Sequence, residues 1–101
     1  MSTIDVVESG QISPGTMKSF SINGKNILVA NVAGQFYATS NKCTHAGGDL
    51  SHGKLEGTII TCPRHGSKFD VTNGKRIKGP ASKDIDVYKA TVVGKMINIE
   101  I

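Results

Sequence analysis

The sequence predicts a small all-β protein. Apolar residues come in short alternating runs, glycine is frequent with 12 among 101 residues, and no segment keeps the period of about 3.6 residues that marks an amphipathic helix. Asn-Gly dipeptides, which are strong signals for tight hairpins, support the same class. A chain of this length has room for one modest core. We therefore predict a single domain over residues 1–101, built as a small antiparallel sandwich or barrel.

The first part of the chain is predicted to form strands joined by tight turns. Asn23-Gly24 lies between two alternating runs, and both residues tolerate positive φ, so a hairpin is expected there. Residues 32–35 include Gly34 and predict a second turn. In the strand that follows, Phe36 and Tyr37 fall on opposite faces because side chains alternate along a strand. The predicted strands are 3–8, 16–22, 25–32 and 35–39.

The second part of the chain alternates again after a long glycine-containing stretch. Asn73-Gly74 predicts another hairpin turn, leading into residues 75–77. The last run places either Met96 or Ile97, together with Ile99, on an apolar face. The predicted strands are 54–61, 69–72, 84–93 and 95–101.

Two short segments between these strands carry metal-ligand residues. Cys43 and His45 lie two residues apart, sixteen residues separate His45 from Cys62, and His65 follows three residues after Cys62. Each segment therefore offers one thiolate and one imidazole from a tight loop. Two such loops would make a four-ligand metal site. Tetrahedral zinc also takes two cysteines and two histidines, so a zinc-stabilised interaction module is the alternative that these residue types leave open.

The pattern C-x-H-x16-C-x2-H resembles the signature of the Rieske [2Fe–2S] proteins. The resemblance extends through residues 43–48 and 62–70, which are similar to the family's two cluster loops, and Gly79-Pro80-Ala81 resembles its third loop. It implies a three-sheet antiparallel fold with a cluster-binding subdomain at about residues 41–81. It also implies one [2Fe–2S] cluster, held on one iron by Cys43 and Cys62 and on the other by His45 and His65.

Neighbouring residues are expected to tune such a cluster. Ser67 could donate its hydroxyl to a sulfide and raise the potential, or it could simply cap the loop. Glycines 47, 48 and 66 could let backbone N–H groups approach the sulfides, or they could be ordinary loop glycines. His52 lies between the ligand pairs but outside the motif, and we expect an exposed loop histidine, with a proton relay as the alternative. Pro80 is expected to cover the cluster, with a plain turn as the alternative.

Departures from the family pattern predict the low-potential branch. High-potential members carry an extra cysteine in each loop and join them in a disulfide, whereas here those places are Gly48 and Arg64. They also carry a tyrosine that donates to a cysteine sulfur, and the matching residue here is Phe69. Losing that donor should lower the potential. The resemblance is thus to the soluble ferredoxins that feed oxygenases.

The predicted function is one-electron transfer without substrate chemistry. In the systems that the sequence resembles, the donor is a flavin-dependent NAD(P)H reductase and the acceptor is a terminal oxygenase. The alternative is a non-catalytic iron-sulfur subunit of a larger oxidoreductase complex. No Ser, His and Asp set or carboxylate pair has a catalytic spacing, and the two tyrosines do not interleave with basic residues as a nucleic-acid platform requires.

The chain is expected to be soluble and cytoplasmic. Residues 1–10 lack the apolar core of a secretory signal, and no run approaches the roughly 18 apolar residues of a membrane span. Both cysteines are assigned to the metal, which leaves none for a structural disulfide and suits a reducing compartment.

Positive charge is concentrated around the motif. The net charge is +4, with eight Lys or Arg against three acids in residues 42–83 and four against five elsewhere. Lys42 and Arg64 adjoin the ligand residues and should lie near the cluster in any fold. We expect this basic rim to steer an acidic partner. The alternative is that these basic residues are only a solvated surface, in which case partner choice would rest on apolar contacts around Ala46, Leu50 and Pro80.

Overall fold

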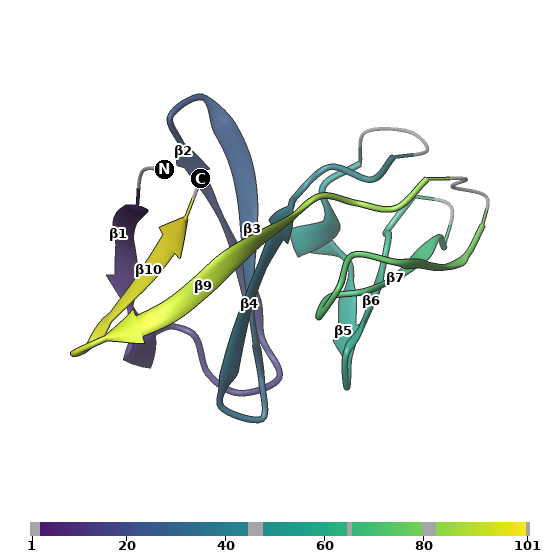
Figure 1. The fold of residues 1–101 in the computed structure, drawn as a ribbon. Coiled ribbons are helices and arrows are strands. Elements are labelled where there is room, and N and C mark those ends of the chain that lie inside the picture. Colours follow the sequence, from purple (N-terminus) through teal and green to yellow (C-terminus); the bar gives the residue numbers. More distant parts are fainter. Residues whose placement is uncertain (1–2, 45–47, 65, 80–82, 101) are drawn as a thin grey trace.

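The computed structural model describes residues 3–44, 48–64, 66–79 and 83–100, and within them the regular structure is almost entirely β (Figure 1). Every strand pairing is antiparallel. The prediction of an all-β antiparallel fold is confirmed. The described elements are β1 (Thr3–Glu8), the 3-10 helix η1 (Ser9–Gln11), β2 (Met17–Ile22), β3 (Lys25–Val32), β4 (Gln35–Ser40), the 3-10 helix η2 (Leu50–His52), β5 (Lys54–Glu56), β6 (Ile59–Thr61), β7 (Lys68–Asp70), β8 (Arg76–Lys78), β9 (Val87–Val93) and β10 (Met96–Glu100).

The large sheet contains six strands in the order β1-β10-β9-β4-β3-β2. Strand β9 joins its two halves, because it pairs with β10 over five residues and with β4 only through Val87 and Tyr88. The sheet curls into a nearly closed barrel, so that side chains from both outer strands, such as Ile4 on β1 and Phe20 on β2, pack against one inner core. The resemblance implied three antiparallel sheets, and the corresponding parts here are the two halves of this one six-stranded sheet and the separate small sheet.

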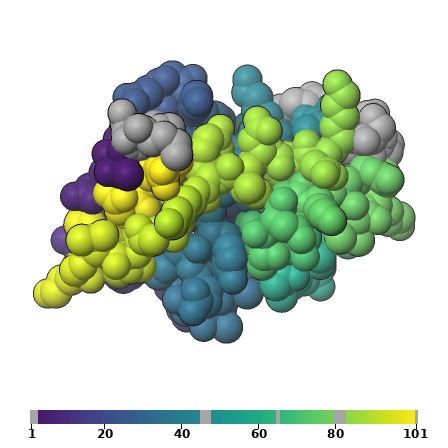
Figure 2. Space-filling view, viewed as in Figure 1, coloured from purple at the N-terminus to yellow at the C-terminus, as the bar shows by residue number. Residues whose placement is uncertain are grey.

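The small sheet lies at the other end of the molecule and has the order β5-β6-β7-β8 (Figures 1 and 2). The sequence predicted one continuous strand over 54–61, and this is wrong. The chain reverses at Gly57, whose φ of 61° is the left-handed conformation that glycine adopts without steric cost. Strands β5 and β6 are therefore an antiparallel hairpin with Leu55 opposite Ile60.

The strand predicted over 84–93 begins later than expected, at Val87. The preceding residues are held by the small sheet instead: the Ile85 N–H donates to the Gly74 carbonyl at 2.9 Å, and the Asp84 carboxylate accepts from the Arg76 N–H at 2.9 Å. These hydrogen bonds hold the segment before β9 against the turn between β7 and β8. This segment runs from the small sheet to the large one (Figure 2).

Two hydrophobic cores lie on opposite faces of β3. Ile27 and Val29 face the barrel interior, whereas Leu28 and Ala30 face the small sheet, and all four side chains are fully buried. The next strand continues the alternation, with Phe36 against the first core and Tyr37 against the second, as the sequence predicted. Strand β3 is thus a shared wall, and the small sheet is built upon it.

Most of the predicted turns are found where the sequence placed them. Asn23 and Gly24 have φ of 50° and 78°, and the hairpin they close pairs Ile22 with Lys25. The turn at Asn73-Gly74 is also present, but it is wider than a two-residue hairpin, since β7 ends at Asp70 and β8 begins at Arg76. Neither of the two described helices is long or apolar enough to cross a membrane.

Candidate metal centre

Each predicted ligand loop is closed at its base by the backbone of its own cysteine. The Cys43 N–H donates to the Gly48 carbonyl at 2.9 Å, and the Cys62 N–H donates to the Ser67 carbonyl at 2.8 Å. In both loops the partner lies five positions after the cysteine, so four residues lie between the two in the sequence. The first loop continues a short ladder in which Lys42 bridges Asp49, and the second continues the pairing of β6 with β7. The two loops are therefore extensions of paired backbone.

Both cysteines point into the core between the two sheets. Cys43 and Cys62 are each 3% exposed, and neither forms a disulfide. They belong to one hydrophobic cluster with Leu50, Ile60 and Phe69. Thiols held together in this way by two closed loops are suited to a metal, for which the thiolate is a strong and soft ligand.

The remaining predicted ligands, His45 and His65, lie outside the described residues. Among the residues that the structure describes, no group of three or more His, Cys, Asp and Glu side chains gathers that could hold a metal ion. The four-residue set thus stays a prediction. The described residues also exclude Ala46, Gly47, Pro80 and Ala81. The expectation that Pro80 covers the cluster therefore stays a prediction.

Ser67 is fully buried at the base of the second loop, where its carbonyl accepts from the Cys62 N–H. The preceding Gly66 has a φ of 78°, and its N–H donates to the Cys62 carbonyl at 3.2 Å. The loop needs glycine there because the left-handed conformation is costly for other residues. Its backbone can therefore turn tightly around whatever Cys62 binds.

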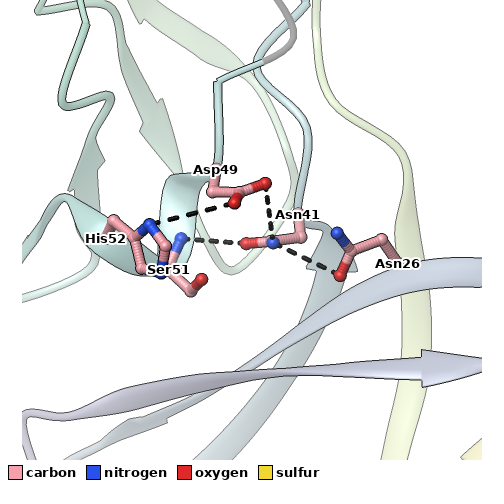
Figure 3. Close-up of polar contacts among 5 residues, drawn as sticks. All are labelled: Asn26, Asn41, Asp49, Ser51 and His52. Atoms are coloured by element: carbon pink, nitrogen blue, oxygen red, sulfur yellow. Dashed lines mark hydrogen bonds and ion pairs between the residues drawn. The ribbon is translucent and has the colours of Figure 1, made fainter.

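A buried asparagine that the sequence analysis missed holds the first loop in place (Figure 3). The Asn41 amide oxygen accepts from the Ser51 N–H at 2.8 Å, and its amide nitrogen donates to the Asn26 side chain at 3.3 Å and to Asp49 at 3.5 Å. Its backbone adds a bond from the Leu50 N–H at 2.8 Å. Asn41 thereby joins β3, the loop base and η2. Only its position two residues before Cys43 signalled this role.

The loops also contact each other and the segment that precedes β9. A Cβ added at Gly48 would meet the Arg64 Cδ at 3.0 Å, so the aliphatic part of Arg64 lies directly over Gly48. These are the two places at which the resemblance put a disulfide in high-potential relatives. The Thr44 hydroxyl donates to the Lys83 carbonyl at 2.8 Å. Methylene packing therefore connects the two loops, and one hydrogen bond connects the first loop to the segment that precedes β9.

His52 and Leu50 differ from each other in exposure, and only one of the two predictions was correct. His52 is exposed at 75% of its side chain, as expected, although it belongs to η2 and lies 3.8 Å from the Asp49 carboxylate (Figure 3). Leu50 is fully buried, so the expectation that it could form an apolar docking contact is wrong. The 3-10 turn directs it inward, against Cys43 and Cys62.

Together these features define a class: a small all-β protein in which two closed loops hold a pair of buried cysteines suited to binding a metal. Comparisons with known proteins agree. The model of the Rieske [2Fe–2S] domain family matches residues 2–89. The chain belongs to the Rieske [2Fe–2S] family. It carries one Rieske-type cluster and is an electron carrier rather than an enzyme.

Similar proteins are ferredoxin components of oxygenase systems. One, from the naphthalene 1,2-dioxygenase/salicylate 5-hydroxylase systems of Ralstonia sp., is 40% identical over 89 residues, which cover 88% of this chain and 86% of that protein. Another, from the naphthalene 1,2-dioxygenase system of Pseudomonas aeruginosa, is 35% identical, with 97% and 94% covered. The solved ferredoxin of carbazole 1,9a-dioxygenase from Nocardioides aromaticivorans IC177 superimposes with a TM-score of 0.94 at 29% identity, over 98% and 97% of the chains.

Proposed function

We propose that this chain carries single electrons from a flavin-dependent NAD(P)H reductase to a terminal oxygenase in the cytoplasm. The observation that carries the proposal is the pair of buried cysteines at the bases of two matching loops, in a chain related over nearly its whole length to ferredoxin components of oxygenase systems. A matched chain occurs in the complex of reduced oxygenase and oxidised ferredoxin of carbazole 1,9a-dioxygenase, at 32% identity, a TM-score of 0.92 and 96% and 91% coverage.

The residues proposed to hold the cluster are Cys43 and Cys62 on one iron and His45 and His65 on the other. The cluster supplies a reversible one-electron couple. The chain's own contribution is to hold the two thiolates in a dry core and to keep the loops closed. Ser67 is proposed to donate its hydroxyl toward the cluster, which would stabilise the reduced state and raise the potential.

The cluster loops and the small sheet are proposed to form a cluster-binding subdomain of one domain, at about residues 41–81. Three facts support this division: the small sheet pairs with no strand of the large sheet among the described residues, it has its own core around Phe69, and both cysteines belong to that core. A cluster held at one end of the molecule would bring its electron close to a partner that docks at that end.

Anaerobic purification followed by absorption spectroscopy and metal analysis tests the proposal. We expect a reddish-brown protein with two irons and two acid-labile sulfides. Voltammetry should place the potential in the lower half of the class range of roughly −150 to +300 mV, because Phe69 lacks a donor to the cysteine sulfur. A colourless protein with one zinc would contradict the proposal, and a potential near the top of the range would contradict the low-potential assignment.

A further inference from the structure

The strand register aligns three lysines in one row across the small sheet. Lys54 on β5 lies opposite Thr61 on β6, Thr61 lies opposite Lys68 on β7, and Lys68 lies opposite Lys78 on β8. Residues directly opposite in an antiparallel pair point to the same face. The face is the outer one, since Leu55, Ile60 and Phe69 form the alternate row and pack into the core. We call Lys54, Lys68 and Lys78 the lysine row.

The lysine row is costly to the fold and is not neutralised. Like charges directly opposite each other in a sheet are destabilising, and Lys68 faces Lys78 in this way. Within the described part of the chain, none of the three ammonium groups forms an ion pair. Two acids share the outer face, two positions further along their strands: Asp70 on β7, and Glu56 on β5, which also lines the cleft described next. Among the described residues neither carboxylate forms an ion pair with the lysine row, so the row keeps an excess of positive charge. The arrangement therefore favours an external anion.

A cleft beside the lysine row gives that anion a defined place. It has a volume of about 390 Å³ and is lined by His52, Gly53, Lys54, Glu56, Thr61, Cys62, Pro63 and Lys68. Lys68 reaches from β7 to its neighbour β6 and donates to the Thr61 hydroxyl at 3.0 Å, which holds its ammonium at the cleft. An ammonium has three donors, so two remain for a carboxylate. Cys62 lines the same cleft, so a carboxylate bound there lies beside a proposed cluster ligand.

We propose that the lysine row and its cleft are the docking surface for an acidic patch of a protein redox partner, whose carboxylates bind between Lys54 and Lys68. This rests on the proposed function, and it names the surface and the chemistry of the partner. Thr61, Cys62 and Lys68 belong to the segments that form the base of the second cluster loop. Docking here therefore brings an acidic partner to the cluster end of the molecule and leaves the barrel end free.

The test compares two double variants with equal charge changes. Lys54→Gln/Lys68→Gln removes two charges from the cleft, and Lys18→Gln/Lys95→Gln removes two exposed charges from β2 and the β9–β10 turn of the large sheet. The first readout is stopped-flow oxidation of the reduced holoprotein by hexacyanoferrate(III), a trivalent anion, at about 10 mM and 300 mM salt, where the Debye length falls from about 30 Å to under 10 Å. The second is the affinity for an octaglutamate peptide.

We expect the cleft variant to lose about tenfold or more in oxidation rate at low salt, within the range of steering effects, and to bind octaglutamate correspondingly more weakly. The barrel variant should change either quantity less than twofold. Lys54→Gln alone should show part of the loss, which excludes an effect of the broken Lys68–Thr61 bond. Equal losses in both double variants, or no loss in either, would overturn the proposal.

Failure of the docking surface can be told apart from failure of the proposed function. The visible spectrum, the iron content and reduction by dithionite report on the cluster and do not depend on the lysine row. Octaglutamate binding reports on the surface and needs no electron transfer. Arg64 is a poorer probe than the lysine row, because it lies between two proposed ligands and packs on Gly48.

Discussion

The two ends of this molecule are stabilised in different ways. The large sheet has strands of five to eight residues around a core made of aliphatic side chains such as Ile27, Val29, Ile97 and Ile99. Every strand of the small sheet has three residues, and β8 is exposed along its whole length. The core of that end includes both cysteines.

This difference indicates that the small sheet depends on the large sheet for its folding, whereas the large sheet depends little on the small one. The small sheet packs on Leu28 and Ala30 of β3, so it needs the large sheet as its wall. Among the residues that the structure describes, the barrel core contains none from the small sheet or from the cluster loops. A bound metal stabilises a small domain by contributing its binding free energy to folding. We therefore expect the cluster to be essential to one end and dispensable to the other.

The largest effect should follow loss of a cysteine ligand. Cys43→Ser or Cys62→Ser should abolish cluster binding and leave residues 43–81 without fixed structure, because no disulfide holds the loops. The barrel strands should keep their dispersed amide signals in a nuclear magnetic resonance spectrum. If residues 43–81 stayed as well dispersed as the barrel, the small sheet would be shown to fold without the cluster.

A cavity in the barrel core should damage both ends. Ile97→Ala should lower the free energy of unfolding by about 2–5 kcal/mol, since the side chain is fully buried and the barrel carries β3. Chemical denaturation followed by circular dichroism and by visible absorbance should show the two signals shifting together. Ile97→Val, the milder control, should cost about 0.5–1.5 kcal/mol. A shift confined to the circular dichroism signal would contradict one-way dependence.

Loss of the buried amide at the first loop should weaken only the cluster end. Asn41→Ala leaves the part-buried Ser51 N–H without its acceptor, and this should cost at most the roughly 1–3 kcal/mol of a fully buried unsatisfied donor. We expect faster loss of visible absorbance on heating. Asn98→Ala is the control, because it removes one exposed hydrogen bond to Asp5 in the large sheet. Equal rates of cluster loss in the two variants would show that Asn41 does not position the loop.

The smallest effect concerns the barrel alone and appears only at alkaline pH. Burial, with a smaller contribution from the Asp86 carboxylate, raises the pKa of Tyr88 above its usual value. The unfolded chain then ionises first, so this contribution to stability is complete below about pH 10 and is lost as pH rises through the folded-state pKa. Tyr88→Phe should flatten the fall in stability above about pH 10, measured by chemical denaturation at a series of pH values. Identical slopes in the two proteins would show that Tyr88 does not contribute.

The strand pattern of the barrel could be predicted from the sequence because its signals are local. The run Thr3–Glu8 was predicted with its observed bounds, and Asn23-Gly24 specified its hairpin. In the small sheet such signals were weaker. The reversal at Gly57 has a single glycine and no flanking turn residues, so two short strands resembled one. Residues 84–86 alternate like a strand. Tertiary hydrogen bonds hold them elsewhere, because the Ile85 N–H donates to Gly74 and the Asp84 carboxylate accepts from Arg76.

The sequence by itself determined the β class, the tight turns of the large sheet and the metal-binding chemistry, because alternation, glycine φ preferences and cysteine–histidine spacing are properties of a few neighbouring residues. Tertiary structure alone decided how those parts meet. Only the fold brings Asn26, Asn41 and Asp49 together, buries Leu50 and places Arg64 over Gly48. The same is true of the lysine row, since strand register, and not sequence spacing, aligns Lys54, Lys68 and Lys78 on one face.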